Sequence, residues 1–369
     1  MNYPKLVLEG RDALQTLGQH QNFCGGPIRC LARMTCFTML WIIVAGCQSS
    51  GCSGDRVDQL IRQLGSSDPS ARASAAAALN NYGARAEKAV PLLAKLLTDP
   101  DLSVRRAAAT TLAYIGPSSA AAKPELLCAL KDEDADVRAA AVMAIGRIPS
   151  PTAADITTLA GLLSDSSRHV RIQAAEAVTV GGAETKVALP RLVAALGDVD
   201  ASVRAKVAEA IGTIGPDAAP VTEKLSELLG DRDSFTRYAA ATALGRIGPH
   251  AKDAVPALRL ALRDPDAKVQ AAAARSLWEI SANTADSVPV LIQCLKSLEQ
   301  RTVPGSADRF DLVPYSAARY AAIQALGEIG PAARAAVPAI KEVRVDGEPT
   351  IREAADVALK RIEGDQPSH

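Results

Sequence analysis

Aspartate and arginine recur along this sequence at spacings regular enough to form a line of paired charges. Arginine returns every 33 residues, at Arg72, Arg105, Arg138, Arg171, Arg204 and Arg237. Aspartate lies six residues ahead of these positions, at Asp99, Asp132, Asp165, Asp198 and Asp231. A carboxylate held beside a guanidinium can shift a pKa for proton transfer, or it can simply join two segments of backbone. Since the pair recurs in successive repeats, we interpret this ladder as structural, with the aspartate capping a helix and a neighbouring arginine binding it through its planar fork.

Two helices in each repeat would position these charges. Proline is tolerated in the first turn of a helix and marks the start of each first helix, at Pro91, Pro124, Pro190, Pro256, Pro289 and Pro338. A second helix follows the aspartate, and in the second repeat its apolar face is formed by Val104, Ala108, Thr111, Leu112 and Ile115. Glycine ends this second helix, at Gly83, Gly116, Gly182, Gly215, Gly248 and Gly330.

One helix pair cannot bury its own apolar face, whereas stacked pairs share a continuous core. The sequence therefore predicts an all-α fold, an α-solenoid of about nine helix pairs with a 33-residue period over residues 55–364. Hydrophobic residues make up 48% of the chain and aromatic residues only 3%, so alanine must do much of the packing.

The pattern Asp-Pro-Asp-x-x-Val-Arg-x-x-Ala-Ala, followed by Leu-Gly-x-Ile-Gly-Pro, resembles HEAT repeats of the short bacterial type found in phycobilisome lyases. This resemblance covers residues 55 to about 363 and implies the fold but no particular activity. HEAT-like deoxyhypusine hydroxylases hold iron through His-Glu pairs. None of the four histidines here precedes glutamate, so the resemblance does not imply that activity.

The sequence contains no zinc-ligand spacing, phosphate-binding loop or nucleophile motif, and we predict no catalytic residue, metal or cofactor. Lys and Arg total 41, as do Asp and Glu, so no uniform field attracts nucleic acid and no such partner is expected. Cys128 and Cys294 fall on first helices five repeats apart, too far for a disulfide, and both are predicted to be buried thiols.

The amino-terminal part reads as a targeting segment. We divide it into an extension or misassigned start (1–33), an apolar signal (34–46) and a tether (47–54). The residues Val44-Ala45-Gly46-Cys47 resemble the lipobox of bacterial lipoproteins, which implies acylation of Cys47. An uncleaved anchor is the alternative, although the apolar stretch is short for a membrane helix. Gln48 in place of aspartate resembles the sorting signal for the outer membrane, so we expect a lipid-anchored protein of the bacterial cell envelope on the periplasmic face of that membrane.

The repeat pattern breaks down near residues 270–314. Residues that depart from the pattern there can serve a purpose other than packing between repeats. Gln270 replaces the ladder arginine, Trp278 replaces a glycine, and about 16 residues are inserted at about 299–314. Aromatic side chains and arginine are frequent anchors of binding surfaces. The candidate partner-binding residues are Arg301, Arg309, Phe310, Tyr315, Tyr238 and Trp278. The alternatives are that Trp278 fills a gap in the core and that the insertion is a solvated loop.

These observations predict a non-catalytic HEAT-repeat scaffold or adaptor, monomeric and lipid-anchored, that binds a protein partner. An enzyme similar to the chromophore lyases and a purely structural spacer are the competing hypotheses. A deep pocket lined by carboxylates would favour the enzyme, whereas a shallow groove would favour the scaffold.

Overall fold

The computed structural model describes residues 50–296, 313–346 and 348–364, and every regular element within these ranges is a helix. The chain divides into two units, Met1–Gln59 and Leu60–His369. Helix α3 (Ser50–Gln63) crosses this boundary and begins inside the stretch 47–54 that the sequence assigns to a tether. No helix in the described ranges has both the length and the apolar character needed to cross a membrane.

Long and short helices alternate along the second unit. The second helices of the repeats are α4 (Pro69–Leu79), α6 (Leu102–Ile115), α8 (Ala135–Gly146), α10 (Arg168–Thr179), α12 (Ala201–Ile214), α14 (Ser234–Ile247), α16 (Ala267–Ser281), α18 (Val313–Ile329) and α20 (Pro349–Glu363). The first helices after α3 are α5 (Val90–Leu96), α7 (Lys123–Ala129), α9 (Ala153–Gly161), α11 (Leu189–Ala195), α13 (Thr222–Leu228), α15 (Val255–Ala261), α17 (Thr284–Lys296) and α19 (Val337–Asp346). With α3, the described residues thus hold nine helices of each kind in chain order, and the predicted all-α repeat fold is confirmed.

Short 3₁₀ segments, which the sequence analysis does not predict, lie beside the first helices. They are η1 (Asn80–Ala89), η2 (Gly116–Ala122), η3 (Leu162–Ser164), η4 (Gly182–Ala188), η5 (Gly215–Val221), η6 (Gly248–Ala254) and η7 (Gly330–Ala336). Gly116 ends α6 with φ at 69°, a backbone conformation that disfavours any residue with a β-carbon. At the end of α16 this glycine is replaced by Ser281, and Ala282 takes the positive φ of 54° instead.

The prolines sit near the start of the first helices as expected, for example in the first turns of α5, α7, α11 and α15. Pro289 is the exception. It lies inside α17, which begins five residues earlier at Thr284, directly after α16 and without a 3₁₀ segment. The eighth repeat therefore enters its first helix by a different route from its neighbours.

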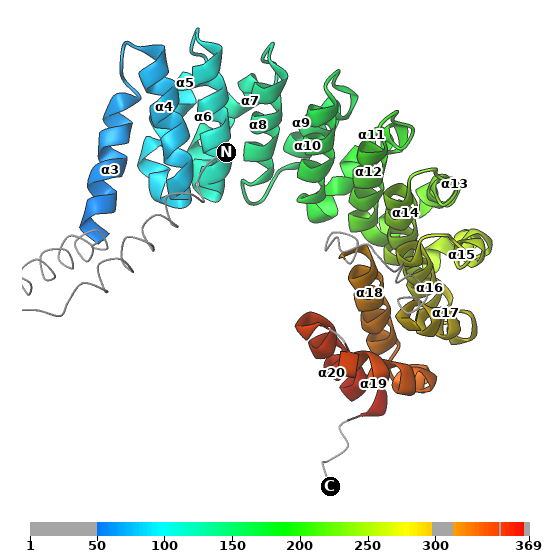
Figure 1. Cartoon of the computed structure of the whole chain (residues 1–369). Helices are drawn as coiled ribbons and strands as arrows, with labels where there is room; N and C mark the ends of the chain where they lie inside the picture. Colours follow the sequence, from blue (N-terminus) through cyan, green and yellow to red (C-terminus); the bar gives the residue numbers. More distant parts are fainter. Residues whose placement is uncertain (1–49, 297–312, 347, 365–369) are drawn as a thin grey trace, which may run out of the picture. The chain divides into compact units, whose positions relative to one another are not determined.

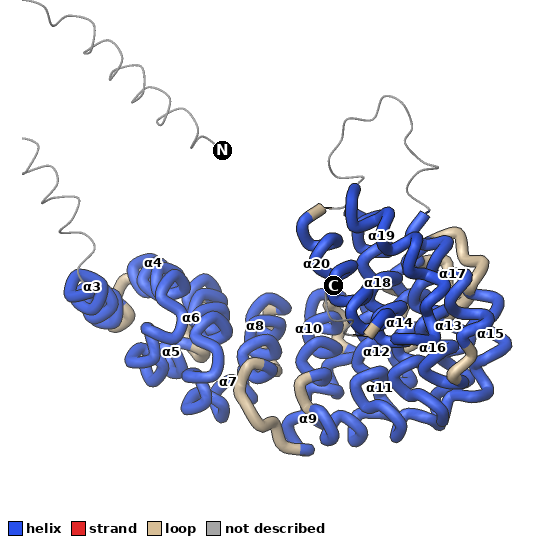
Figure 2. The backbone as a smooth tube through the Cα atoms, turned by 90° about the horizontal axis from the view of Figure 1, so that it is seen from below, coloured by secondary structure: helices blue, strands red, loops and turns tan. Residues whose placement is uncertain are grey.

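Each second helix packs against the second helix of the repeats before and after it, so that α4 to α20 form one layer (Figures 1 and 2). The first helices and 3₁₀ segments form the other layer, and the core lies between the two. Small side chains permit the close approach. A β-carbon added to Gly146 would lie only 2.9 Å from the β-carbon of Ala177 on the next second helix. Ala108, Ala141 and Ala240 are fully buried, as the low aromatic content predicts.

Candidate functional site: grooves between the second helices

The charge ladder joins neighbouring repeats through their turns. In six consecutive steps the ladder arginine binds the aspartate 27 residues further on; the pairs are Arg72–Asp99, Arg105–Asp132, Arg138–Asp165, Arg171–Asp198, Arg204–Asp231 and Arg237–Asp264. The Nε and Nη2 of Arg204 each donate to one carboxylate oxygen of Asp231 at 2.8 Å. Its Nη1 donates to the backbone carbonyl of Asp198 at 2.8 Å, so one guanidinium connects two successive turns.

The helix cap lies two residues later than the sequence interpretation places it. Helix α12 begins at Ala201, and Asp200, not Asp198, accepts hydrogen bonds from the first backbone N–H groups of the helix. Asp198 lies too far ahead of the helix to reach these groups and instead accepts the N–H of Asp200 at 2.8 Å. Asp101 and Asp134 cap α6 and α8 in the same way. The turns before α6, α8 and α12 thus use one aspartate for the cap and another for the arginine, whereas Ser167 before α10 makes no side-chain cap.

The ladder charges satisfy one another. Burial raises the pKa of Asp231, but hydrogen bonds from Arg204 and from the Asp233 N–H lower it by more, so the net direction is downward. The pKa values of Asp99 and Asp165 are lowered by the same balance. The hydrogen bonds to Asp231 raise the pKa of Arg204. Both partners stay charged and bound to each other, so the ladder connects successive repeats through their turns.

The ladder changes character at Gln270. Its Nε2 still donates to the carbonyl of Asp264, at 2.6 Å, but a neutral amide cannot form the ion pair to the next repeat. The residue 27 positions further on, Ser297, lies outside the described residues. The thiol of Cys294 instead donates to Gln270 Oε1 at 3.8 Å and to the Ala267 carbonyl at 3.7 Å.

The two cysteines on first helices differ in environment. Cys294 is buried as predicted, and burial raises its pKa to about 12. Cys128 is exposed, so the prediction of a second buried thiol is wrong. Counted from the helix-starting proline, Cys128 is the fourth residue after Pro124 and Cys294 the fifth after Pro289. One residue turns a helical side chain by about 100°, which moves Cys128 from the core to solvent.

We therefore expect iodoacetamide to modify Cys128 of the native chain within minutes at pH 8, while Cys294 stays unmodified until denaturant is added. Only the thiolate is the nucleophile, and burial suppresses both the thiolate and the access to it. Site-resolved mass spectrometry of the alkylated peptides measures this, with a Cys128→Ser variant as the control. Equal rates at the two residues in the native protein would contradict the structure.

The structure describes three of the candidate partner-binding residues. Tyr238 lies on α14 and is exposed, whereas Trp278 is half-buried and packs against the buried cluster of the last repeats. Tyr315 lies in the first turn of α18. Cys47, Arg301, Arg309 and Phe310 lie outside the described residues. Of the predicted partner-binding residues, Tyr238, Trp278 and Tyr315 thus lie within the described part of the chain.

Tyr238 lines a groove between α12 and α14 that we call the aromatic groove. Its volume is about 490 Å³, and its lining comprises Ile172, Ser202, Ala205, Lys206, Glu209, Asp233, Phe235, Tyr238, Ala239, Thr242, Ala243 and Arg246. Phe235 is 66% exposed and Tyr238 38%. The Lys268 ammonium lies 5.5 Å from the centre of the Phe235 ring. The groove thus has an apolar floor, two accessible rings and a polar rim.

Phe235 violates the repeat. The residue two positions before the ladder arginine is Ser103, Asp136, His169 and Ser202 in the four preceding repeats. Phe235 is 66% exposed, and its ring contacts the next repeat at Lys268 of α16. We did not select Phe235 from the sequence, because which position faces solvent depends on the packing of the helix. Comparing this position across the repeats would have singled it out.

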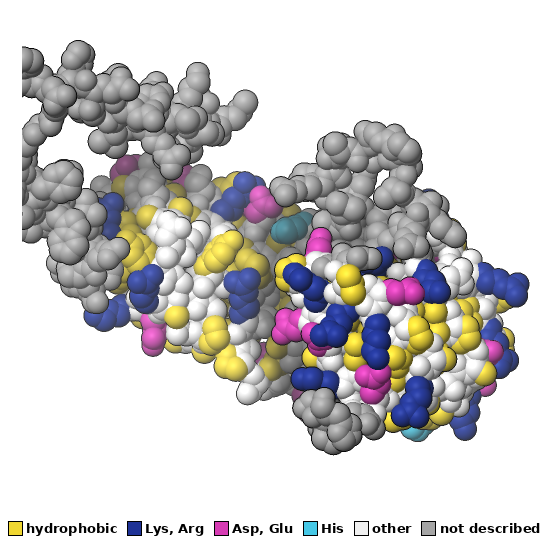
Figure 3. Space-filling model, turned by 60° about the horizontal axis from the view of Figure 1, so that its bottom comes forward, with side chains coloured by type: hydrophobic (Ala, Val, Ile, Leu, Met, Phe, Trp, Pro, Cys, Tyr) yellow, Lys and Arg dark blue, Asp and Glu magenta, His cyan; other side chains and the backbone are white. Residues whose placement is uncertain are grey.

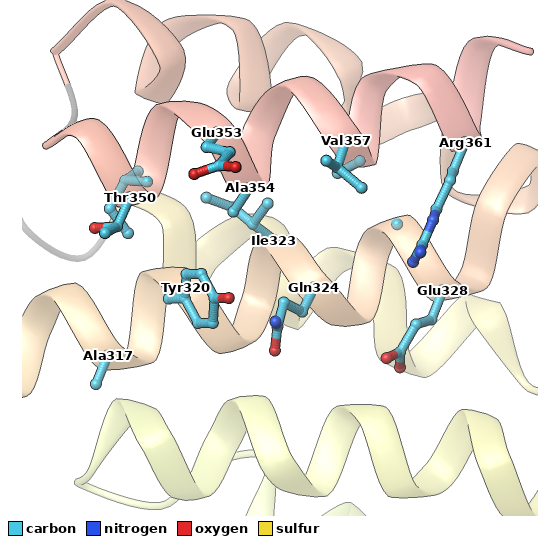
Figure 4. Close-up of a pocket in the computed structure, with 13 residues that line it drawn as sticks. Ala317, Tyr320, Ile323, Gln324, Glu328, Thr350, Glu353, Ala354, Val357 and Arg361 are labelled. Atoms are coloured by element: carbon cyan, nitrogen blue, oxygen red, sulfur yellow. The ribbon is translucent and has the colours of Figure 1, made fainter. Parts of the chain in front are cut away.

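A second groove runs between α18 and α20 (Figure 4), and we call it the terminal groove. It encloses about 690 Å³ and is lined by Ala317, Tyr320, Ile323, Gln324, Gly327, Glu328, Thr350, Ile351, Glu353, Ala354, Val357, Ala358 and Arg361. Tyr320 occupies the same repeat position as Tyr238, one residue after the ladder arginine. Glu328 pairs with Arg275 of α16 at 3.0 Å.

Both grooves are open troughs. Within the described ranges, no group of three or more histidine, cysteine, aspartate or glutamate side chains is arranged to hold a metal ion. Figure 3 shows Lys and Arg interspersed with Asp, Glu and apolar side chains on the face it displays. The face displayed in Figure 3 therefore mixes both signs of charge with apolar side chains.

Comparison with known families agrees with this architecture. The model for HEAT repeats matches residues 57–126, 123–195 and 189–277, which together exceed half of the chain. This chain is a HEAT-repeat protein. The model for the PBS lyase HEAT-like repeat matches residues 318–346 of the same HEAT-repeat chain. No curated protein matches its sequence.

Solved structures resemble the HEAT-repeat chain at low identity. An engineered protein is 24% identical, with 84% of this chain and 89% of that chain covered and a TM-score of 0.51, which reflects a shared fold. The complex of CpcE and CpcF of phycocyanin lyase from Nostoc sp. PCC7120 is 22% identical, with 73% and 93% covered and a TM-score of 0.37. The second likeness is too weak to carry an argument about activity.

Proposed function

We propose that this HEAT-repeat protein is a non-catalytic scaffold of the bacterial cell envelope that binds a protein partner through the exposed face of its second helices. The observation that carries the proposal is the pair Phe235 and Tyr238 in the aromatic groove. Aromatic anchors in a pocket with a polar rim are the commonest centre of a protein–protein interface. Partner binding also explains why Phe235 departs from the repeat, since the fold itself makes no demand for an aromatic residue there.

The inserted segment belongs to the same proposal. Arg301, Arg309 and Phe310 carry the side-chain types of an interface, and Tyr315 follows them at the start of α18. We propose that these residues extend the interface beyond the aromatic groove. Deletion of residues 300–314 is therefore expected to remove or weaken the same partner. An unchanged set of bound proteins would exclude the insertion from the interface.

The test of the aromatic groove is quantitative purification of partners from membranes with the tagged full chain. We expect the double variant Phe235→Ser/Tyr238→Ser to lose at least tenfold of the partner, because each buried aromatic anchor contributes on the order of 2 kcal/mol. The matched control is Leu260→Ser on α15 of the other layer, whose side chain is 76% exposed. Equal recovery with wild type, double variant and control would favour the structural spacer.

We further propose that acylated Cys47 anchors the chain at the periplasmic face of the outer membrane. The support is the lipobox-like sequence Val44-Ala45-Gly46-Cys47 and the glutamine that follows it. Labelling of cells with an alkyne fatty acid tests this, with Cys47→Ser as the negative variant and Cys52→Ser as the control. Label that persists in Cys47→Ser would contradict the lipid anchor at this cysteine. If the label is lost, separation of the inner and outer membranes shows in which of them the wild-type protein lies.

A further inference from the structure

We propose that the terminal groove is a second binding site, for an extended peptide segment that carries one basic and one acidic side chain four residues apart with an apolar side chain midway. The site is independent of the aromatic groove. The proposal rests on the side chains of Tyr320 on α18 and of Glu353, Val357 and Arg361 on α20. It also rests on the distance between the two charged side chains, Glu353 and Arg361.

The floor of the groove is apolar and the two helices run in the same direction (Figure 4). Ile323 and Ile351 are buried, and Ala354 and Ala358 add small apolar side chains to the lining. Val357 is 46% exposed and Tyr320 39%, so both present apolar surface to an occupant. Burial of such surface on binding is favourable and opposes the costs of association.

Two charged side chains of α20 lie at the two ends of the groove. Figure 4 shows Glu353 and Arg361 on either side of Val357 along this helix. They are eight residues apart, which corresponds to about 12 Å along a helix. Within the described residues, neither side chain forms an ion pair. Glu328, which faces Arg361 across the groove, is already engaged by Arg275 at 3.0 Å.

An extended peptide matches this spacing. Its residues advance about 3.3 Å each, so side chains four positions apart are about 13 Å apart and point to the same side. The side chain between them, two residues from each, also points to that side and would meet Val357. The pattern Lys-x-Leu-x-Glu therefore places lysine at Glu353, leucine on the apolar floor and glutamate at Arg361. A peptide running the other way, with the order Glu-x-Leu-x-Lys, makes the same three contacts.

The experiment measures fluorescence anisotropy of three labelled peptides, Gly-Lys-Ser-Leu-Ser-Glu-Gly and its Lys/Lys and Glu/Glu counterparts, with the full chain. We expect wild type to bind the mixed peptide about fivefold more tightly than either like-charged one, because each mismatch replaces attraction with repulsion. Glu353→Lys makes both ends positive and should switch the preference to the Glu/Glu peptide. Arg361→Glu should switch it to the Lys/Lys peptide.

Two control variants change the net charge equally at exposed positions outside the groove, Glu342→Lys and Lys360→Glu. They should leave the preference for the mixed peptide unchanged. The proposal is overturned if the mixed peptide does not bind at 1 mM, if wild type binds all three peptides equally, or if the controls switch preference as the groove variants do. Phe235→Ser/Tyr238→Ser should bind the mixed peptide like wild type, so the two sites can fail separately.

Discussion

Replacement of Arg204 by alanine lowers the free energy of unfolding by about 3 kcal/mol, the effect expected when one partner of a buried ion pair is removed. The Arg204 side chain is only 9% exposed and that of Asp231 13%. Without the guanidinium, Asp231 keeps a charge with poor access to water, and the Asp198 carbonyl loses its donor. Urea unfolding followed by circular dichroism measures the change, with Arg334→Ala at an exposed position of η7 as the control.

Acid should weaken the same contact. The pKa of Asp231 is lower in the folded chain than its ordinary value of 3.8, so the ion pair contributes fully above that pH and is lost as the pH falls below it. Asp99 and Asp165 act in the same direction. The difference in stability between wild type and Arg204→Ala should therefore shrink below about pH 4. A difference that is constant from pH 7 to pH 3 would show that the ion pair is not its source.

Replacement of Ala240 by phenylalanine is expected to cost about 3 kcal/mol or more, because the side chain is fully buried where second helices approach closely. The ring has no space and must push α14 away from its neighbours. Thermal unfolding measures the loss, and Thr213→Phe, at an exposed position of α12, is the matched control. Similar melting temperatures for Ala240→Phe and wild type would mean that the layer is packed less tightly than the structure describes.

Fold and ladder could be predicted from the sequence because a repeat presents the same local requirements many times. A single Asp–Arg spacing says little about the fold. Its recurrence every 33 residues indicates the length of the repeat, which aspartate each arginine meets, and the layer in which the helices lie. The cap was misplaced by two residues, because the exact start of α12 depends on how the turn before it folds. The sequence pattern identifies Asp198 and Asp200 as turn residues but does not say which one reaches the helix.

The candidate sites were less predictable. Tyr238 was predicted as a binding residue because its side chain is aromatic. Phe235 is recognised as one only from the structure, in which it faces solvent beside Tyr238. The terminal groove needs residues from α18 and α20 that lie about 30 positions apart in the sequence. Glu353 and Arg361 become a pair of charges with a defined separation only once α20 is known to be continuous between them. Such surface properties belong to single repeats. Comparison of the repeats therefore does not reinforce them, as it reinforces the features that recur.

Each Arg–Asp contact of the ladder connects one repeat only to the next. Gain or loss of a whole 33-residue unit by gene duplication or deletion would therefore recreate the same contact at the new junction and leave the others unchanged. Such a chain can change its length in steps of one unit at little energetic cost. Its binding residues, which belong to individual units, would be carried to new separations without being redesigned.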